Sequence, residues 1–157
     1  MEFKLLRVNM ATKECRFENV PEQYAGLGGR GLTSTIVAAE VEPTCSALGP
    51  PNKLVFAPGL LGGTHCPNSN RTSVGCKSPM TGGIKEANSG GQPGGHLAKM
   101  GITAIVGEDI AEEGSWFQLE LTKDSAKLVP ATAAGLNNYD AVAKLREQYG
   151  DNCSYVS

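Results

Sequence analysis

The pattern of hydrophobic and polar residues along the chain predicts many short strands. Apolar and polar side chains alternate over residues 2–8 and 13–20, which is the period of a strand with one buried face, and the polar turn between them predicts a hairpin. Compact apolar or alternating segments predict further strands over residues 53–57, 72–77, 102–106, 116–121 and 126–129.

Helical patterns separate these strands. Residues 33–41 predict a helix capped at its start by Thr33 or Ser34, and residues 96–100 predict a short helix with a glycine stop. Residues 138–149 carry apolar side chains at helical spacing. Because the strands occur in runs, without sustained alternation of single strands and helices, the pattern predicts an α+β fold with a mixed or antiparallel sheet and flanking helices.

Composition and charge restrict the class of protein. The chain has 157 residues, of which 40% are hydrophobic and 19% charged, and this is typical of one ordered globular domain. A net charge of −2 gives no electrostatic reason to bind nucleic acid or an anionic membrane. No apolar run reaches the length of a membrane span, and residues 1–10 lack the apolar centre of a signal peptide, so we expect a cytoplasmic protein.

The stretch from Pro58 to Gly95 carries the candidate chemistry. It holds ten of the twenty glycines but only four charged side chains. A flexible linker would be glycine with serine and little else, whereas here glycine alternates with an apolar strand and with isolated basic and amide side chains. Backbone without side chains can approach a ligand closely and offer it N–H donors. The stretch therefore predicts a cradle for a phosphate-bearing cofactor.

Arg71 and Lys77 are candidate anion contacts within this stretch. The Arg71 guanidinium comes directly before an apolar strand, where it could hold a phosphate with two hydrogen bonds or could be a solvated arginine at a strand end. Lys77 precedes Ser78-Pro79 and could be a second anion contact or an ordinary turn lysine. For both residues the sequence leaves the two alternatives open.

Asn88, Ser89, Gly90 and Gly91 place an amide, a hydroxyl and two bare backbone units in succession. These residues could bind the same ligand, and Asn88 could also form an Asx-turn that caps the following helix. Residues 28–31 (GGRG) precede a helix and could likewise hold an anion or form a simple glycine turn. Neither the dinucleotide fingerprint nor a P-loop is present in the sequence.

Candidate catalytic groups do not emerge from the sequence. The five cysteines are widely spaced, with no C-x-x-C pair, which favours ordinary structural thiols over a disulfide framework or a metal site. His65 and His96 have no carboxylate close in sequence that would orient them, and no serine lies in a nucleophile-elbow context. The residues alone therefore predict a cofactor-binding surface without a catalytic group.

At these residues the chain resembles a known family. The segment from Arg71 to Gly91, RTSVGCKSPMTGGIKEANSGG, is similar to the signature of the N-terminal domain of aldehyde:ferredoxin oxidoreductases. In that tungsten-enzyme family an R-x-x-V-x-x-K-S-P-L-T-G segment runs into A-N-S-G-G at this separation. Weaker similarities extend the resemblance over nearly the whole chain, at Val8-Asn9 with Thr12, residues 28–32, residues 50–56 and residues 101–106.

The resemblance implies a fold and a cofactor. In this family the N-terminal domain is α+β, internally duplicated and saddle-like, and it binds a bis-pterin cofactor of tungsten or molybdenum whose two phosphates are bridged by magnesium. By motif match, Arg71 would contact a pterin phosphate, and Asn88 and Gly90 would contact the cofactor through amide and backbone groups, with Asn88 helping to hold the magnesium. The expected cofactor-binding set, which includes no catalytic residue and no protein ligand to the redox metal, is completed by Ser89, Gly91 and Lys77.

The resemblance also implies a larger protein. Residues 1–157 would be a single tungstopterin-binding N-terminal domain, inactive alone, with the [4Fe-4S] cysteines in later domains of the same polypeptide. Residues 152–156 predict a strand that begins directly after the last helix, so we expect the natural sequence to continue past Ser157. The full-length enzyme would oxidise aldehydes to carboxylic acids with ferredoxin as electron acceptor. It could form a homo-oligomer. The alternative is a stand-alone pterin- or phosphate-binding module without redox activity.

Overall fold

The computed structural model describes residues 3–156, so that Glu2 of the predicted first strand and Ser157 lie outside the described residues. The described chain contains two sheets, three α-helices and one short 3-10 turn. The helical elements are η1 (Glu22–Tyr24), α1 (Gly29–Glu40), α2 (Pro93–Lys99) and α3 (Asn138–Tyr149). The strands are β1 (Lys4–Asn9), β2 (Cys15–Asn19), β3 (Lys53–Pro58), β4 (Thr72–Lys77), β5 (Ile84–Ser89), β6 (Ile102–Glu108), β7 (Phe117–Leu121) and β8 (Ala126–Pro130).

The larger sheet is mixed and has six strands in the order β2-β1-β6-β3-β4-β5. Only β1 and β6 run parallel, and every other neighbouring pair is antiparallel. A separate antiparallel pair is formed by β7 and β8. The predicted α+β class with a mixed sheet and flanking helices is therefore confirmed. A hairpin followed by a helix occurs twice, in β1–β2–α1 and β7–β8–α3, but the internal duplication and the saddle shape stay predictions.

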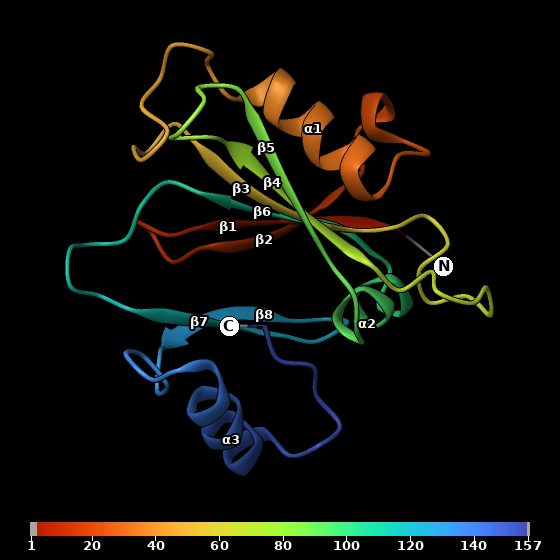
Figure 1. The fold of residues 1–157 in the computed structure, drawn as a ribbon, viewed down its shortest axis with the longest axis vertical. Helices are drawn as coiled ribbons and strands as arrows, with labels where there is room; N and C mark the ends of the chain where they lie inside the picture. The colour runs from red at the N-terminus through yellow and green to blue at the C-terminus, as the bar shows by residue number, and fades with distance from the viewer. Residues whose placement is uncertain (1–2, 157) are drawn as a thin grey trace.

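The hydrophobic core lies between this sheet and α1, which crosses one face of it (Figure 1). The helix contributes Leu32, Ile36 and Val37, three residues on one helical stripe that are almost completely buried. Gly75 in β4 lets the helix approach closely, because a Cβ there would lie 2.7 Å from the Cβ of Thr33. The sheet side of the core is formed by Leu5, Val55, Ala57, Ala104 and Val106.

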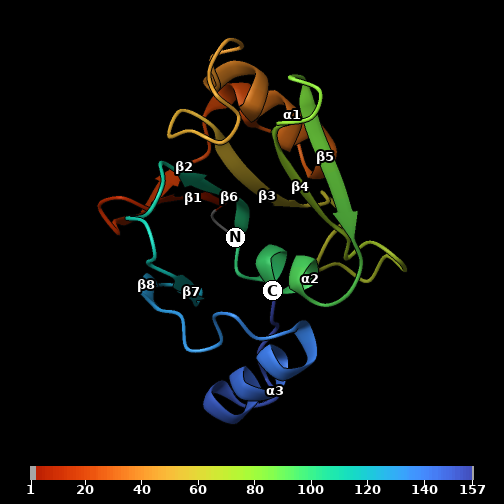
Figure 2. The same ribbon diagram turned by 60° about the vertical axis from the view of Figure 1, so that its left-hand side comes forward.

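The opposite side of the sheet carries a second layer. Figure 2 shows α2 and the β7–β8 pair below the sheet, with α3 lying farther out. The short helix α2 packs against β3 and β6 and buries Leu97. The outer helix α3 buries only Ala141. The central strands β3 and β6 are therefore covered on both faces, while α3 is attached more loosely.

Four sequence predictions differ from the structure. Helix α1 begins at Gly29, so Thr33 lies inside it as a buried residue, and α2 begins with Pro93, a residue favoured in the first helical turn. The edge strand β5 has no counterpart among the predicted strands. Residues 152–156 form no strand; instead the Ser154 hydroxyl lies 2.7 Å from Nδ1 of His96 on α2.

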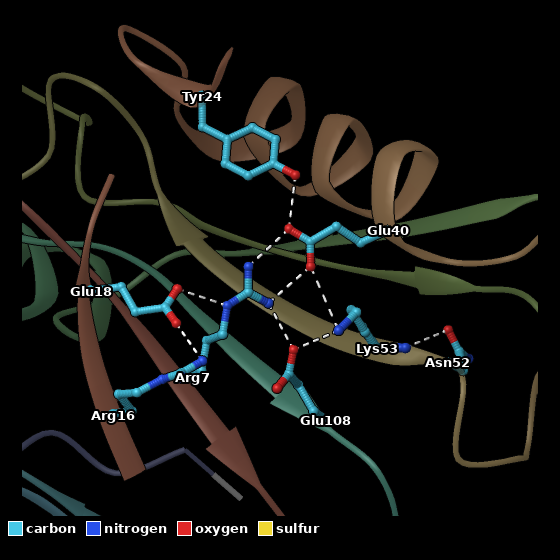
Figure 3. A network of polar contacts seen from close by, with 8 residues as sticks. All are labelled: Arg7, Arg16, Glu18, Tyr24, Glu40, Asn52, Lys53 and Glu108. Carbon is cyan, nitrogen blue, oxygen red and sulfur yellow. Dashed lines mark hydrogen bonds and ion pairs between the residues drawn. The ribbon is translucent and has the colours of Figure 1, made fainter. Parts of the chain in front are cut away.

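A cluster of charged side chains joins most elements of the larger sheet to α1 (Figure 3). The Arg7 guanidinium on β1 donates hydrogen bonds of 2.7–2.9 Å to three carboxylates. The Lys53 ammonium lies 2.5 Å from one of them, and the buried Tyr24 hydroxyl donates to another at 2.8 Å. The three carboxylates belong to Glu18 on β2, Glu40 on α1 and Glu108 on β6.

Candidate functional site

The candidate site lies at one end of the β4–β5 ladder. These strands pair antiparallel, with Thr72 opposite Ser89 and Ser73 opposite Asn88. The residue before β4, Arg71, therefore comes next to the residues that follow β5. The structure thus brings together five of the six residues expected to bind the cofactor, namely Arg71, Asn88, Ser89, Gly90 and Gly91.

The Arg71 guanidinium is held from one side only. Its Nε donates a hydrogen bond to Oδ1 of Asn88, and its Nη2 lies 3.4 Å from the Asn88 carbonyl oxygen. Among residues 3–156, no hydrogen bond is made by Nη1 and no carboxylate lies within 4.0 Å of the guanidinium. The side chain is exposed. Arg71 therefore keeps both its charge and two N–H groups available for an anion.

Two glycines leave space beside this guanidinium. A Cβ placed on Gly90 would lie 3.5 Å from Nη1 of Arg71. A side chain at this position would therefore contact the unbonded Nη1 end of the guanidinium, called here its free edge. Gly91 has a φ of +106°, a conformation that side-chain-bearing residues rarely adopt. The Ser89 hydroxyl is exposed and lies 3.3 Å from the Gly90 carbonyl oxygen. The unbonded Nη1 of Arg71 thus faces the bare backbone at Gly90.

Lys77 lies at the other end of β4 and is not brought to this site. It is only 8% exposed, and its ammonium donates hydrogen bonds to the carbonyl oxygens of Pro43 and, at 2.7 Å, Cys45. These carbonyls belong to the loop that follows α1. Lys77 therefore fixes that loop to the sheet. Of the two alternatives for Lys77, the structure favours the ordinary lysine beside a turn, because its ammonium is bonded to backbone carbonyls.

The side-chain amide of Asn88 is engaged at both ends. Its oxygen accepts from Arg71, and its Nδ2 donates to Oγ of Ser73 at 3.0 Å. The Asx-turn alternative is wrong, since Asn88 belongs to β5 and the residue that precedes α2, Gln92, makes no side-chain cap. Sequence reasoning missed Ser73, which is only 1% exposed, because only the register of β4 against β5 places it opposite Asn88.

The glycines before α1 form a turn with a carboxylate beside it. No side chain caps the helix at Gly28, and Arg30 pairs with Glu86 of β5 at 3.1 Å. The Glu86 Oε1 is buried without a hydrogen-bond partner among the described residues. A carboxylate in this position disfavours a bound anion, so the geometry favours the simple glycine turn over an anion site.

The glycines of α2 serve packing. A Cβ on Gly94 would lie 2.7 Å from the Asn70 carbonyl oxygen, and one on Gly95 would lie 2.9 Å from the Asn70 side chain. Both glycines are buried. They allow α2 to pack directly against the segment that leads into Arg71. Their role at the site is therefore to hold this segment in place, and they do not contact the ligand themselves.

Within residues 3–156 no group of three or more His, Cys, Asp or Glu residues could hold a metal ion. No helix in this range is long and apolar enough to cross a membrane. The five cysteines are all free thiols, three of them partly buried and two exposed. The Arg71 site is thus the cluster that best fits the predicted chemistry.

The fold and this site define an α+β domain with an arginine-bearing glycine loop at the edge of a mixed sheet. The family model described as "Aldehyde ferredoxin oxidoreductase, N-terminal domain" matches residues 5–157. That match spans nearly the whole chain. The protein therefore belongs to the aldehyde ferredoxin oxidoreductase family and represents its N-terminal domain.

Individual relatives support this assignment. The chain is 44% identical over 112 residues to the tungsten-containing aldehyde ferredoxin oxidoreductase of Thermococcus kodakarensis, and 43% identical over 112 residues to that of Pyrococcus furiosus. Each alignment covers 70% of this chain and 18% of the relative, so the chain corresponds to a minor part of those enzymes.

A solved structure supports the fold. The active-site complex BamBC of benzoyl-coenzyme A reductase, determined with 1,5-dienoyl-CoA, superposes with a TM-score of 0.85 and 24% sequence identity. The superposition covers 94% of this chain and 23% of that one. At this identity the likeness concerns the fold alone.

Proposed function

We propose that this chain is the cofactor-binding N-terminal domain of an oxidoreductase that carries tungsten or molybdenum on two pterins. The observation that carries the proposal is the free Nη1 edge of Arg71, held toward Gly90 with no carboxylate nearby. Arg71 binds a pterin phosphate through this edge. The family assignment and the relatives named as tungsten-containing enzymes support the choice of cofactor.

The residues present fit such a group. A phosphate monoester needs a cation with parallel N–H donors and room to approach it, and these are what Arg71 and Gly90 offer. Ser89 adds an exposed hydroxyl, and Gly91 lets the backbone turn away from the ligand. A side chain in place of Gly90 would contact the guanidinium and narrow this approach.

The chain's own residues would bind and orient the cofactor. Arg71 would neutralise one phosphate. Asn88 would hold Arg71 through its side chain, and its backbone would lie beside the expected magnesium. When bound, the metal centre supplies the two-electron redox chemistry. Lys77 takes no part, since its ammonium is bonded inside the fold.

The full-length enzyme, in this proposal, oxidises aldehydes to carboxylic acids in the cytoplasm. A [4Fe-4S] cluster, expected in later domains of the same polypeptide, would supply the electron path to ferredoxin. The names of the relatives, which are tungsten-containing aldehyde ferredoxin oxidoreductases, support aldehyde as substrate and ferredoxin as electron acceptor. A stand-alone binding module without redox activity is not favoured, because the relatives that match this chain are much longer oxidoreductases.

The test is the change Arg71→Ala in the full-length protein, produced with tungstate or molybdate in the medium. We expect cofactor affinity to fall about 10–100-fold, because charge-assisted hydrogen bonds contribute about 1.5–3 kcal/mol. Metal content by mass spectrometry and pterin fluorescence after release measure occupancy. Arg146→Ala, which removes an exposed arginine on α3, is the matched control. Unchanged occupancy in Arg71→Ala would contradict the proposal.

A further inference from the structure

We infer that Ser73 is a positioning residue that aims Arg71 at its anion through Asn88. This inference rests on the proposed function, because it assigns a role in binding the same phosphate. Three side chains form a line from the interior to the surface, in the order Ser73, Asn88, Arg71. Only the last of them is expected to contact the ligand through its side chain.

Ser73 provides the fixed end of this line. It lies in β4, and its side chain faces the first turn of α1, where a Cβ on Gly29 would lie 3.6 Å from its hydroxyl oxygen. It is 1% exposed. Its hydroxyl is therefore buried beside α1, and its oxygen accepts from Nδ2 of Asn88 at 3.0 Å.

The chemistry of the three groups fixes the orientation of the Asn88 amide. A guanidinium has only N–H donors, so the amide must turn its oxygen toward Arg71. The amide nitrogen then points at Ser73, whose oxygen can accept. A reversed amide would place its N–H groups against those of the guanidinium. Removing the Ser73 hydroxyl therefore removes the contact that holds the amide in the orientation Arg71 requires.

The orientation of the Asn88 amide determines where the free edge of Arg71 points. With Nε bonded to Asn88 and Nη2 near its carbonyl, the plane of the guanidinium is set, and Nη1 faces Gly90. A long side chain that is already ordered loses less conformational freedom when it binds its ligand.

The test compares two buried serines, Ser73 near the start of β4 and Ser78 directly after its end. Ser73→Ala removes the link to Asn88. Ser78→Ala is the matched control, since Ser78 is 4% exposed and its hydroxyl oxygen accepts from the backbone N–H groups of Met80 and Thr81, far along the strand from Arg71. Both variants lose one buried hydroxyl with backbone or amide partners, so a purely structural effect should appear in both.

Two measurements on the full chain separate positioning from binding. Nitrogen-15 NMR of arginine side chains follows hydrogen exchange at Nε of Arg71, and a titration with inorganic phosphate at constant ionic strength gives the dissociation constant. We expect Ser73→Ala to speed the Nε exchange at least several-fold and to raise the dissociation constant about 3–10-fold, as expected for a lost preorganised contact. Ser78→Ala should leave both at the wild-type values.

Asn88→Asp provides a second test that does not depend on the folding of Ser73→Ala. A carboxylate in place of the amide should keep Arg71 in position, so that Nε exchange stays slow, while it neutralises the guanidinium and weakens phosphate binding at least tenfold. If phosphate binding stayed at the wild-type level in this variant, Arg71 would not be the anion contact.

The outcomes distinguish the two proposals. If Ser73→Ala keeps slow Nε exchange and unchanged phosphate binding while Arg71→Ala abolishes binding, the positioning role of Ser73 is wrong and the anion site stands. If the wild-type chain binds phosphate no better than Arg71→Ala does, the proposed function fails and the positioning role fails with it. If Nε exchange becomes faster and phosphate binding weaker in Ser73→Ala but not in Ser78→Ala, the inference is supported.

Discussion

At the scale of single residues, the glycines of the Pro58–Gly95 stretch have two different functions. Gly90 and Gly91 are exposed beside Arg71, where absent side chains leave room for a ligand. Gly94 and Gly95 are buried, and their absent side chains allow α2 to approach the backbone at Asn70. In the sequence both pairs look alike. They differ only in whether other atoms of the protein occupy the space next to each Cα, and that depends on the tertiary structure.

The space around a glycine Cα predicts opposite effects of two glycine-to-alanine changes, one at the buried Gly94 and one at Gly31, which lies in α1 with open space beside it. In Gly94→Ala the new Cβ would lie 2.7 Å from the Asn70 carbonyl oxygen, which is backbone and cannot rotate away, so we expect a loss of about 1–3 kcal/mol in unfolding free energy. Gly31→Ala lies in α1 with nothing within 4 Å of the new Cβ, and should gain about 0.5–1 kcal/mol. Urea denaturation followed by circular dichroism measures both; an equal effect in the two variants would contradict the packing role of Gly94.

At the scale of elements, α3 depends more on its own local interactions than α1 does. It buries one side chain, Ala141, whereas α1 buries four. Its hydrogen bonds to β7 are made through the Tyr149 hydroxyl, which accepts from Gln118 at 2.6 Å and donates to Glu120. A helix with little tertiary burial is stabilised to a larger extent by its cap.

The cap of α3 supplies the element-scale prediction. Oδ1 of Asn137 accepts from the backbone N–H groups of Tyr139 at 3.0 Å and Asp140 at 3.1 Å. Asn137→Ala should destabilise the helix by about 1 kcal/mol, and so raise amide hydrogen exchange in residues 138–149 about fivefold while the β4 amides stay unchanged. Asn138→Ala, a change at the neighbouring exposed position, is the control. Unchanged exchange in α3 would mean that another contact fixes its start.

At the scale of the whole molecule, the charged cluster around Arg7 connects elements that are far apart in sequence (Figure 3). Burial alone would raise the pKa of the Glu40 carboxyl, but hydrogen bonds from Arg7 and Tyr24 outweigh it and leave this pKa below its ordinary value. The pKa of Glu108 is lowered in the same way by Lys53 and Arg7. Burial and the Glu40 hydrogen bond raise the pKa of Tyr24 to about 12.

These pKa shifts predict how stability depends on pH. A carboxyl whose pKa is lower in the folded state stabilises the fold fully above its unfolded pKa, about 4.3, and loses that contribution as the pH falls through the folded value. Glu40→Gln should therefore lower the unfolding free energy at pH 7 by about 1–2 kcal/mol and flatten its decline below about pH 4.5. Urea denaturation at pH 3–8 measures the slope, with Glu42→Gln, an exposed position, as control.

The Tyr24 hydroxyl in the same cluster predicts how stability declines at alkaline pH. The pKa of Tyr24 is higher in the folded state, so its contribution is complete below the ordinary value of about 10 and is lost as the pH rises toward about 12. Tyr24→Phe should remove this part of the decline. A wild-type profile with the same slope as Tyr24→Phe between pH 9 and 12 would contradict the assignment of the shift to Tyr24.

Much of this fold could be predicted from local sequence patterns. The predicted strands at 53–57, 72–77 and 102–106 are confirmed to within a few residues, and α3 has the predicted bounds. The errors fall where nonlocal packing overrides local preference: α1 extends through glycines because its N-terminal turn packs on β4, and β5 exists because β4 offers a partner. The motif from Arg71 to Gly91 led directly to the family, which the family model confirms.

The sequence by itself determined the residue types of the site and the periodicity of most elements, because both depend on neighbours along the chain. Only the tertiary structure decided that Ser73 faces Asn88, that Arg71 keeps a free edge, and that Lys77 is bonded inside the fold. The register of an antiparallel pair determines which side chains meet, and it is set by burial and contacts between segments distant in sequence. For this reason the candidate anion site could be named from the sequence, but the way its arginine is held could not.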